Sequence, residues 1–200
     1  MNVELFYLYD THCPWSYATT ALVNEVATAL PEIKINLLHC ARYDGEEGIE
    51  SSTIEMVQQD SNKAFGQSYL ANYSLAKDST IAANLMTWAQ LKTPHQALAL
   101  LNDIQNSHFQ QANEFNNEQA FTDIISKHKL SPPSKIYNIK KFTKDVEATL
   151  AEADEFQDII ATTAIPALLL AVGDNLVLLN HNLYLKSPKA IVDAIKLELN

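Results

Sequence analysis

The chain has 200 residues, enough for one folded domain with a sizeable buried core. Its 14 lysine and arginine residues stand against 24 aspartate and glutamate residues, a formal net charge of −10. Phosphate backbones repel such a chain, and no basic block interleaved with aromatics is present, so we expect no nucleic-acid partner. The longest apolar run, Ile165 to Val172, is too short to span a bilayer, so we expect no membrane association.

Two cysteines, Cys13 and Cys40, are too few for a disulfide framework. The start of the sequence has neither a basic leader nor a small-residue cleavage site. It therefore predicts a cytoplasmic protein in which both thiols are free. A secreted protein whose leader has been removed would have a similar sequence, and this alternative stays open.

The first 40 residues contain the pattern of a strand, a helix and a second strand. Residues 3–9 are aromatic and aliphatic on both faces, which is typical of a strand buried within a sheet. Pro14 suits the first position of a helix, whose apolar residues recur at helical spacing until Pro31. Residues 33–38 indicate the second strand. Such a βαβ unit has parallel strands and a right-handed crossover.

The end of the chain predicts a hairpin and a final helix. Residues 166–172 and 176–180 are strand-like, with Gly173-Asp174-Asn175 as the turn. Ser187 and Pro188 suit the N-cap and first residue of the helix. The expected inward-facing residues of this helix are Ile191, Val192, Ile195 and Leu199.

Between residues 46 and 160 strand signals disappear and helical patterns follow one another. The expected helices surround Ile54/Val57 and Ile81/Leu85/Trp88, begin at Thr93-Pro94, and cover 117–128, 134–142 and 144–160. We therefore expect an α/β domain made of residues 1–45 and 161–200, interrupted by an all-helical insertion of residues 46–160.

Cys13-Pro14-Trp15-Ser16 stands where the first strand gives way to the first helix. A thiol at a helix start faces unpaired N–H groups and the positive end of the helix dipole, and both favour the thiolate. We therefore expect the pKa of Cys13 to lie below its free value of about 8.5. Ser16, one turn along, is placed to donate its hydroxyl to the sulfur, and a protonated His12 would add a cation. The alternative is an inert, buried cysteine.

This tetrapeptide resembles the redox motif of the thioredoxin superfamily, with serine in place of the second cysteine. The order βαβ, helical block, ββα is similar to that fold. The long insertion and the Cys-Pro-Trp start resemble its DsbA-like branch, which includes FrnE-type proteins, 2-hydroxychromene-2-carboxylate isomerases and kappa-class glutathione transferases. The isomerases and transferases usually have serine at the position of Cys13, so the chain departs from them there.

A second motif, Thr163-Ala164-Ile165-Pro166, precedes the predicted hairpin. In this superfamily the matching proline is cis and lies against the active cysteine. The resemblance implies that Ile165 offers its backbone N–H and C=O to an extended peptide or to glutathione, beside Pro166. It also places Pro14 and Trp15 in the substrate site, Trp15 through a partly exposed ring.

The resemblance implies a thiol–disulfide oxidoreductase or protein disulfide isomerase. Because Ser16 replaces a resolving thiol, we expect monothiol exchange with Cys13 as the nucleophile. The expected partners are thiol- or disulfide-containing proteins or peptides, or glutathione as a co-substrate, with no tightly bound cofactor. Two alternatives stay open: a glutathione-dependent transferase or isomerase of the kappa or hydroxychromene type, and a non-catalytic thioredoxin-fold binding module. The oligomeric state is open.

Cys40 follows the second strand, so we expect it at the same edge of the sheet as Cys13. A structural thiol is favoured, with a resolving role as the alternative. His12 and His39 stand beside the two cysteines, but the spacing of these four residues is not typical of a metal site, and we expect no metal.

Overall fold

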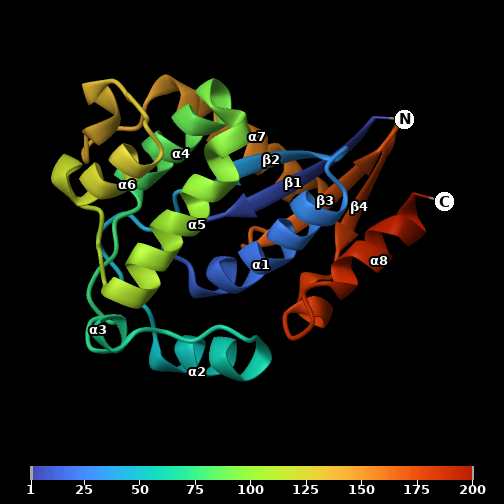
Figure 1. Cartoon of the computed structure of the whole chain (residues 1–200), viewed down its shortest axis with the longest axis horizontal. Coiled ribbons are helices and arrows are strands. Elements are labelled where there is room, and N and C mark those ends of the chain that lie inside the picture. The colour runs from blue at the N-terminus through green and yellow to red at the C-terminus, as the bar shows by residue number, and fades with distance from the viewer. Residues whose placement is uncertain (1, 200) are drawn as a thin grey trace.

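A computed structural model describes residues 2–199, whose strands form one sheet in the order β2-β1-β3-β4 (Figure 1). The strands are β1 (Val3–Tyr9), β2 (Lys34–His39), β3 (Ala167–Val172) and β4 (Asn175–Leu179). β1 is central, parallel to β2 and antiparallel to β3, and β3 and β4 form a hairpin. The predicted buried strand, βαβ unit and hairpin are confirmed.

Helices account for the segment between β2 and β3, and no further strand occurs there within the described part of the chain. The α-helices are α1 (Pro14–Ala29), α2 (Ser51–Asp60), α3 (Gln67–Leu70), α4 (Thr80–Lys92), α5 (Pro94–Gln111), α6 (Thr122–Lys127), α7 (Lys144–Ile159) and α8 (Ala190–Glu198). The 3₁₀ helices are η1 (Glu118–Phe121), η2 (Ser134–Tyr137) and η3 (His181–Tyr184). Among residues 2–199 no helix is long and apolar enough to cross a membrane.

The predicted helix over 134–142 is wrong beyond η2, and the reason is a buried side chain. The Asn84 amide donates to the carbonyl groups of Ile136, Asn138 and Lys141, and its oxygen accepts the N–H of Thr143. Backbone groups that a helix would pair with one another bind the Asn84 side chain instead, and the segment after η2 is a loop with a turn.

Two smaller differences concern helix starts. The predicted helix over 117–128 begins as η1 before α6. The terminal helix begins at Ala190 rather than Pro188, because Ser187 lies in a turn: its N–H donates to Tyr184 and its C=O accepts from Ala190. The expected inward residues Ile191, Val192 and Ile195 are buried.

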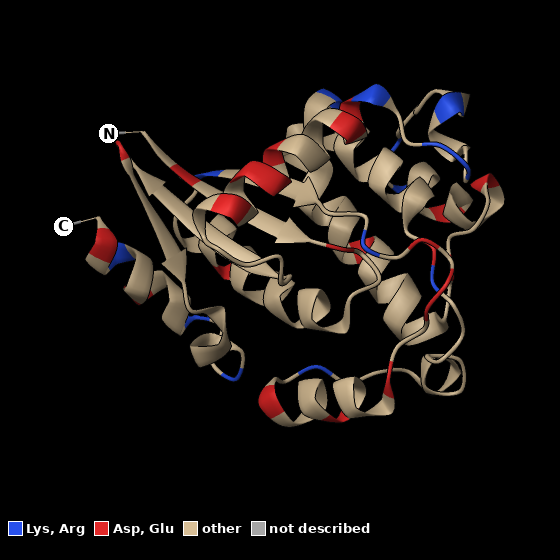
Figure 2. Cartoon of the chain, turned by 180° about the vertical axis from the view of Figure 1, so that it is seen from behind, with Lys and Arg blue, Asp and Glu red and all other residues tan. Residues whose placement is uncertain are grey.

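The two faces of the sheet pack against different helices, because side chains alternate along each strand. Leu5, Tyr7 and Tyr9 point into the main core with α1, whereas Leu8 points to a smaller cluster that includes Ala153 of α7. The strands themselves carry few charges (Figure 2), and β3 and β4 carry none. Lysine, arginine and carboxylate groups lie mainly on helices and loops.

Tyr7 fixes the start of α1 against the sheet. Its side chain is fully buried, and its hydroxyl donates to the carbonyl oxygen of Ser16 at 2.6 Å and lies 3.1 Å from Oγ1 of Thr20. The first turn of α1 therefore has a fixed position relative to β1.

Gly66 marks a close approach between the start of α3 and α5. Its N–H donates to the carbonyl oxygen of Phe109 at 2.9 Å, and a Cβ at this position would overlap the backbone of Gln110. Its φ of −69° is open to any residue, so space alone requires glycine here.

We expect Gly66→Ala to lower the free energy of unfolding by about 2–3 kcal/mol, because α3 must move away from α5. Urea unfolding followed by circular dichroism measures this change. The control is Ser68→Ala, an exposed position on α3 that should change stability by less than about 0.5 kcal/mol. Equal stability of the two variants would show that α3 does not pack as described.

Candidate active site

Cys13 lies where β1 passes into α1. It is the N-cap residue of α1, and Pro14 takes the first helical position. The Cys13 N–H donates to the carbonyl oxygen of Asp10 at 3.2 Å, and the Cys13 carbonyl accepts the N–H of Tyr17 at 3.0 Å. The sequence-predicted position of this thiol, at a strand-to-helix junction, is confirmed.

The expected lowering of the Cys13 pKa is wrong, because the side chain is only 6% exposed. Burial raises the pKa of the thiol, and the negative charge of Asp10 adds to the increase. Hydrogen bonds from the Ser16 hydroxyl and from the N–H groups of Ser16 and Trp15 act in the opposite direction but do not outweigh burial.

Two hydroxyl groups lie at the Cys13 sulfur. Ser16 is fully buried, interacts with the sulfur as expected, and its Oγ accepts the N–H of Asp10 at 3.3 Å. Tyr43, in the loop after β2, also interacts with Cys13 through its side chain. Burial, followed by the nearby sulfur, raises the pKa of Tyr43, so this hydroxyl stays protonated. The sequence analysis did not identify Tyr43.

His12 points into the protein, away from solvent. Its Nδ1 lies 3.0 Å from Oγ1 of Thr11 and 3.7 Å from Oδ1 of Asp10, and its Nε2 lies 3.4 Å from the carbonyl oxygen of Glu114. Its ring packs edge-on against His108, with centroids 4.3 Å apart. Both nitrogens therefore belong to a buried polar network, and a role in tuning Cys13 stays a prediction.

Asp10 is the central member of this network, and the sequence analysis missed it. The carboxylate is fully buried: Oδ1 accepts the His12 N–H at 2.8 Å, and Oδ2 accepts the Arg42 N–H and the Ser79 hydroxyl at 2.7 Å each. Burial alone would raise the pKa of Asp10, but the neighbouring His39 and His12 rings and the His12 hydrogen bonds bring it below its usual range. A polar Asp-Thr-His run directly after a buried strand was the available signal.

His39, at the end of β2, is also fully buried. The N–H of Thr11 donates to its Nε2 at 3.2 Å and the N–H of Ala41 donates to its Nδ1 at 3.0 Å. Burial lowers the pKa of His39 to about 4, so the ring is neutral at pH 7.

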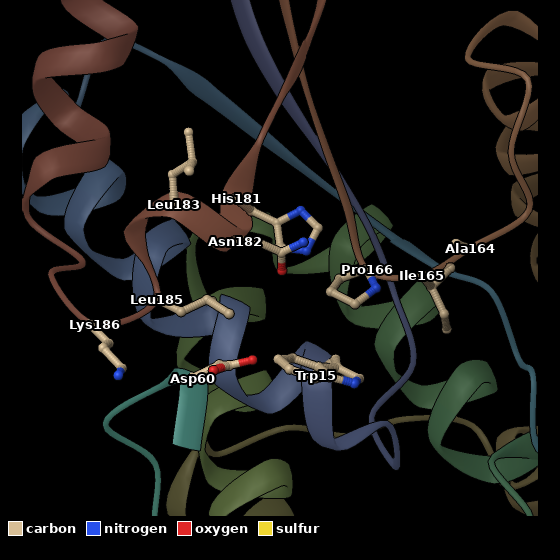
Figure 3. Close-up of a pocket in the computed structure, with 10 residues that line it drawn as sticks. All are labelled: Trp15, Asp60, Ala164, Ile165, Pro166, His181, Asn182, Leu183, Leu185 and Lys186. Carbon is tan, nitrogen blue, oxygen red and sulfur yellow. The ribbon is translucent and has the colours of Figure 1, made fainter. Parts of the chain in front are cut away.

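A pocket of about 670 Å³ brings one residue of the first sequence motif together with residues of the second (Figure 3). Trp15, half-buried on the first turn of α1, lines it together with Ile165 and Pro166. The Ile165–Pro166 peptide bond is cis, as the resemblance implied. Cys13, Pro14 and Ser16 are buried at the start of α1 and are not part of this lining.

The other charged and polar residues of the pocket come from segments that the sequence analysis did not connect with the site. Asp60 ends α2, His181 opens η3, and Lys186 follows η3. The Asn62 amide donates to the carbonyl oxygen of Lys186 at 2.7 Å, which joins these two segments. Burial lowers the pKa of His181 to about 4, so Asp60 and Lys186 are the charged groups of the pocket at pH 7.

Arg42 connects the Cys13 loop with the cis-proline segment. Its N–H donates to Asp10, while its guanidinium Nη2 donates to the carbonyl oxygen of Thr163 at 2.7 Å. No hydrogen bond within residues 2–199 uses the N–H or C=O of Ile165.

Cys40 follows β2 and packs in the smaller cluster, on the face of the sheet opposite the main core. It is 9% exposed and lies among Ala153, Ile165 and Ala167. Its thiol donates to the carbonyl oxygen of Leu38 at 3.6 Å, and burial raises its pKa to about 12. Both cysteines are free. In the described part of the chain, no three His, Cys, Asp or Glu residues are grouped so as to hold a metal ion.

Comparison with known proteins identifies the fold. No family model and no curated protein matches the chain. Among solved structures, the cytosolic disulfide reductase DsbM from Pseudomonas aeruginosa matches with a TM-score of 0.84, 17% identity and 98% coverage of both chains. DsbM with GSH matches at 0.80, with the same identity and coverage.

A periplasmic thioredoxin-like protein from Salmonella enterica serovar Typhimurium matches with a TM-score of 0.56 and 13% identity over 99% of this chain and 84% of that one. At such identities the likeness concerns the fold. The chain has the predicted thioredoxin-like fold with a helical insertion, and the boundaries of 46 and 160 for that insertion stay a prediction.

We expect slow alkylation of Cys13 by iodoacetamide at pH 7, with a rate that still rises at pH 9. The reason is that only the thiolate reacts and burial raises the pKa of this thiol. Intact mass against time at each pH gives the rates. Cys13→Ser is the control, in which Cys40 should stay unmodified; a plateau below about pH 8 would contradict the buried environment.

We expect the protein to lose stability as the pH falls from about 6.5 to about 4. In this range the unfolded chain protonates His39 while the folded chain does not, so protons favour the unfolded state by about 3 kcal/mol. Urea unfolding at pH 7 and pH 4.5 measures the loss. His39→Gln should reduce this pH dependence, whereas the exposed control His95→Gln should leave it unchanged.

Proposed function

We propose that the protein catalyses thiol–disulfide exchange through Cys13, as a disulfide reductase or isomerase that uses glutathione as a co-substrate. One observation carries the proposal: a single thiol caps α1, and Trp15 in the first turn of that helix shares a pocket with the cis Ile165–Pro166 bond. The likeness of the whole fold to a cytosolic disulfide reductase supports the same function.

The proposed reaction has two steps. Cys13 attacks a substrate disulfide RS–SR′, forms Cys13–S–SR and releases R′S⁻, which takes the proton that Cys13 loses. Glutathione then attacks this mixed disulfide, which regenerates the Cys13 thiol and releases RS–SG. Ser16 stands where a second cysteine would resolve the intermediate, so an external thiol is required.

The pocket suits a short peptide disulfide such as glutathione. The free N–H and C=O of Ile165 would pair with an extended backbone in the manner of an added strand. The ring of Trp15 offers an apolar surface. Asp60 would bind an ammonium group of the ligand, and Lys186 would bind a carboxylate. Pro14 would act by orienting the first turn of α1. The structure of DsbM with GSH supports glutathione as a ligand of this fold.

We further propose that the protein works in the cytoplasm without a resident cofactor, and that Cys40 is a structural thiol. Both cysteines are free, which fits a reducing compartment. Cys40 is buried in an apolar cluster against α7, which disfavours attack on a disulfide formed at Cys13.

Intact mass after incubation with oxidised glutathione tests the proposal. We expect one glutathione adduct on Cys13, and loss of both the adduct and glutathione-dependent reduction of a peptide disulfide in Cys13→Ser. Cys40→Ser is the matched control and should retain both. The proposal fails if Cys13→Ser keeps its activity or if Cys40 carries the adduct.

The same variants separate the alternatives. A glutathione transferase would bind glutathione and convert an electrophile in Cys13→Ser, because the sulfur then comes from glutathione. A binding module would show neither adduct nor turnover in the unchanged protein.

A further inference from the structure

The basic residues of the chain are unevenly distributed. Six of the 14 lysine and arginine residues lie within residues 127–144, a segment that contains no aspartate or glutamate. The rest of the chain has eight basic residues against all 24 acidic ones. Blue ribbon accordingly gathers at the upper right of Figure 2, over the helical part of the molecule. A basic region therefore stands on an otherwise acidic protein.

Most lysines of this region have no carboxylate partner. Lys127 forms an ion pair with Asp103 at 2.8 Å. The other five are exposed, and no ion pair within residues 2–199 includes them: Lys129, Lys135, Lys140, Lys141 and Lys144. Like charges repel one another, so this grouping is unfavourable unless an anion offsets it.

Three of these lysines surround one cavity of about 420 Å³, which we call the lysine pocket. Lys135 comes from η2, Lys141 from the loop that follows, and Lys144 from the start of α7. The lining contains one carboxylate, Asp145, so positive charges outnumber negative charges there by two. A cavity of this size suits a small ligand.

A buried side chain determines the shape of the loop in this lining. The Asn84 amide on α4 is fully buried and donates to the carbonyl groups of Asn138 and Lys141, and its oxygen accepts the N–H of Thr143. All three of these partners line the lysine pocket. Because the loop backbone is already held in place, less conformational entropy is lost when a ligand binds.

We propose that the lysine pocket binds a small oxyanion that carries two or more negative charges. Such an anion matches the excess of two positive charges in the lining, and phosphate esters and polycarboxylates share this chemistry. The proposal goes beyond the proposed function, because the lysine pocket shares no lining residue with the pocket of Trp15 and Pro166.

Isothermal titration calorimetry of the full chain tests the proposal with three probes at equal ionic strength and pH 7.5. They are inorganic pyrophosphate, citrate and acetate. We expect saturable binding of pyrophosphate or citrate at one site, and no binding of acetate at the same concentrations, because a single charge does not offset the lining. Tighter binding of pyrophosphate would identify phosphate as the recognised group, and tighter binding of citrate would identify carboxylate.

A matched pair of variants locates the site. Lys141→Gln should weaken binding of the tighter probe by about threefold to fivefold, because it removes one exposed charge from the lining. Lys129→Gln removes the same charge from the same basic region but outside the lysine pocket, and should change the affinity by less than about twofold.

Asp145→Asn gives a result in the opposite direction. It removes the carboxylate from the lining and keeps the size of the side chain, so binding should tighten by about threefold. A misfolded variant would not gain affinity, so this measurement decides the question even where Lys141→Gln disturbs the loop.

The proposal is overturned if neither pyrophosphate nor citrate binds saturably, or if acetate binds as tightly as they do. Equal losses in Lys129→Gln and Lys141→Gln would assign binding to the basic region as a whole and refute the site, as would weaker binding in Asp145→Asn. The glutathione adduct on Cys13 should form in Lys141→Gln as in the unchanged protein. Failure of either test therefore leaves the other proposal in place.

Discussion

The parallel pairing of β1 with β2 determines where the residues of the site lie. Parallel strands end at the same edge of a sheet, so the segments that follow Tyr9 and His39 leave side by side. The N–H of Cys40 continues this pairing by donating to Tyr9 at 2.7 Å. Asp10 therefore meets the residues after β2, and Cys13, three residues later, is the N-cap of α1.

Burial and the start of α1 act on Cys13 in opposite directions. A helix N-terminus stabilises a negative charge by about 0.3–1 kcal/mol, whereas full desolvation shifts a pKa by up to about 3–5 units, several times more energy. At 6% exposure the second effect dominates, and the buried charge of Asp10 adds to it. This thiol is consequently a weaker acid than a free cysteine, and its reactivity depends on the loss of its proton. A helix N-terminus by itself does not make a thiolate.

Local sequence was sufficient for the strands, for the Cys13 N-cap and for most of the helices, because each depends on periodicity or on a cap within a few residues. The prediction of a cis bond at Pro166 came from the resemblance, because a proline before a strand is compatible with either isomer. The burial of Cys13 could not be predicted, because it depends on packing against Tyr43 and other residues far along the chain. The same holds for the short η2, which Asn84 imposes from α4.

The charged residues of the pocket also could not be predicted from local sequence. Asp60 and Lys186 are more than 100 residues apart, and only the folded chain places them in one pocket. The sequence shows Asp10 as a polar residue after a buried strand. That its carboxylate is buried and hydrogen-bonded could not be predicted, because the bonds come from Arg42 and Ser79, which lie far along the chain.

Arg42, the sole arginine of the chain, joins the Cys13 loop to the segment that contains the cis proline. Its backbone holds Asp10 and its side chain holds Thr163, two residues before Ile165. An arginine that instead formed an ion pair with Asp10 would neutralise the charge beside Cys13 and release the segment that presents Ile165. The observed arrangement keeps the carboxylate charged and the segment anchored at once. The positions of the Cys13 loop and of the cis-proline segment thus depend on the same residue.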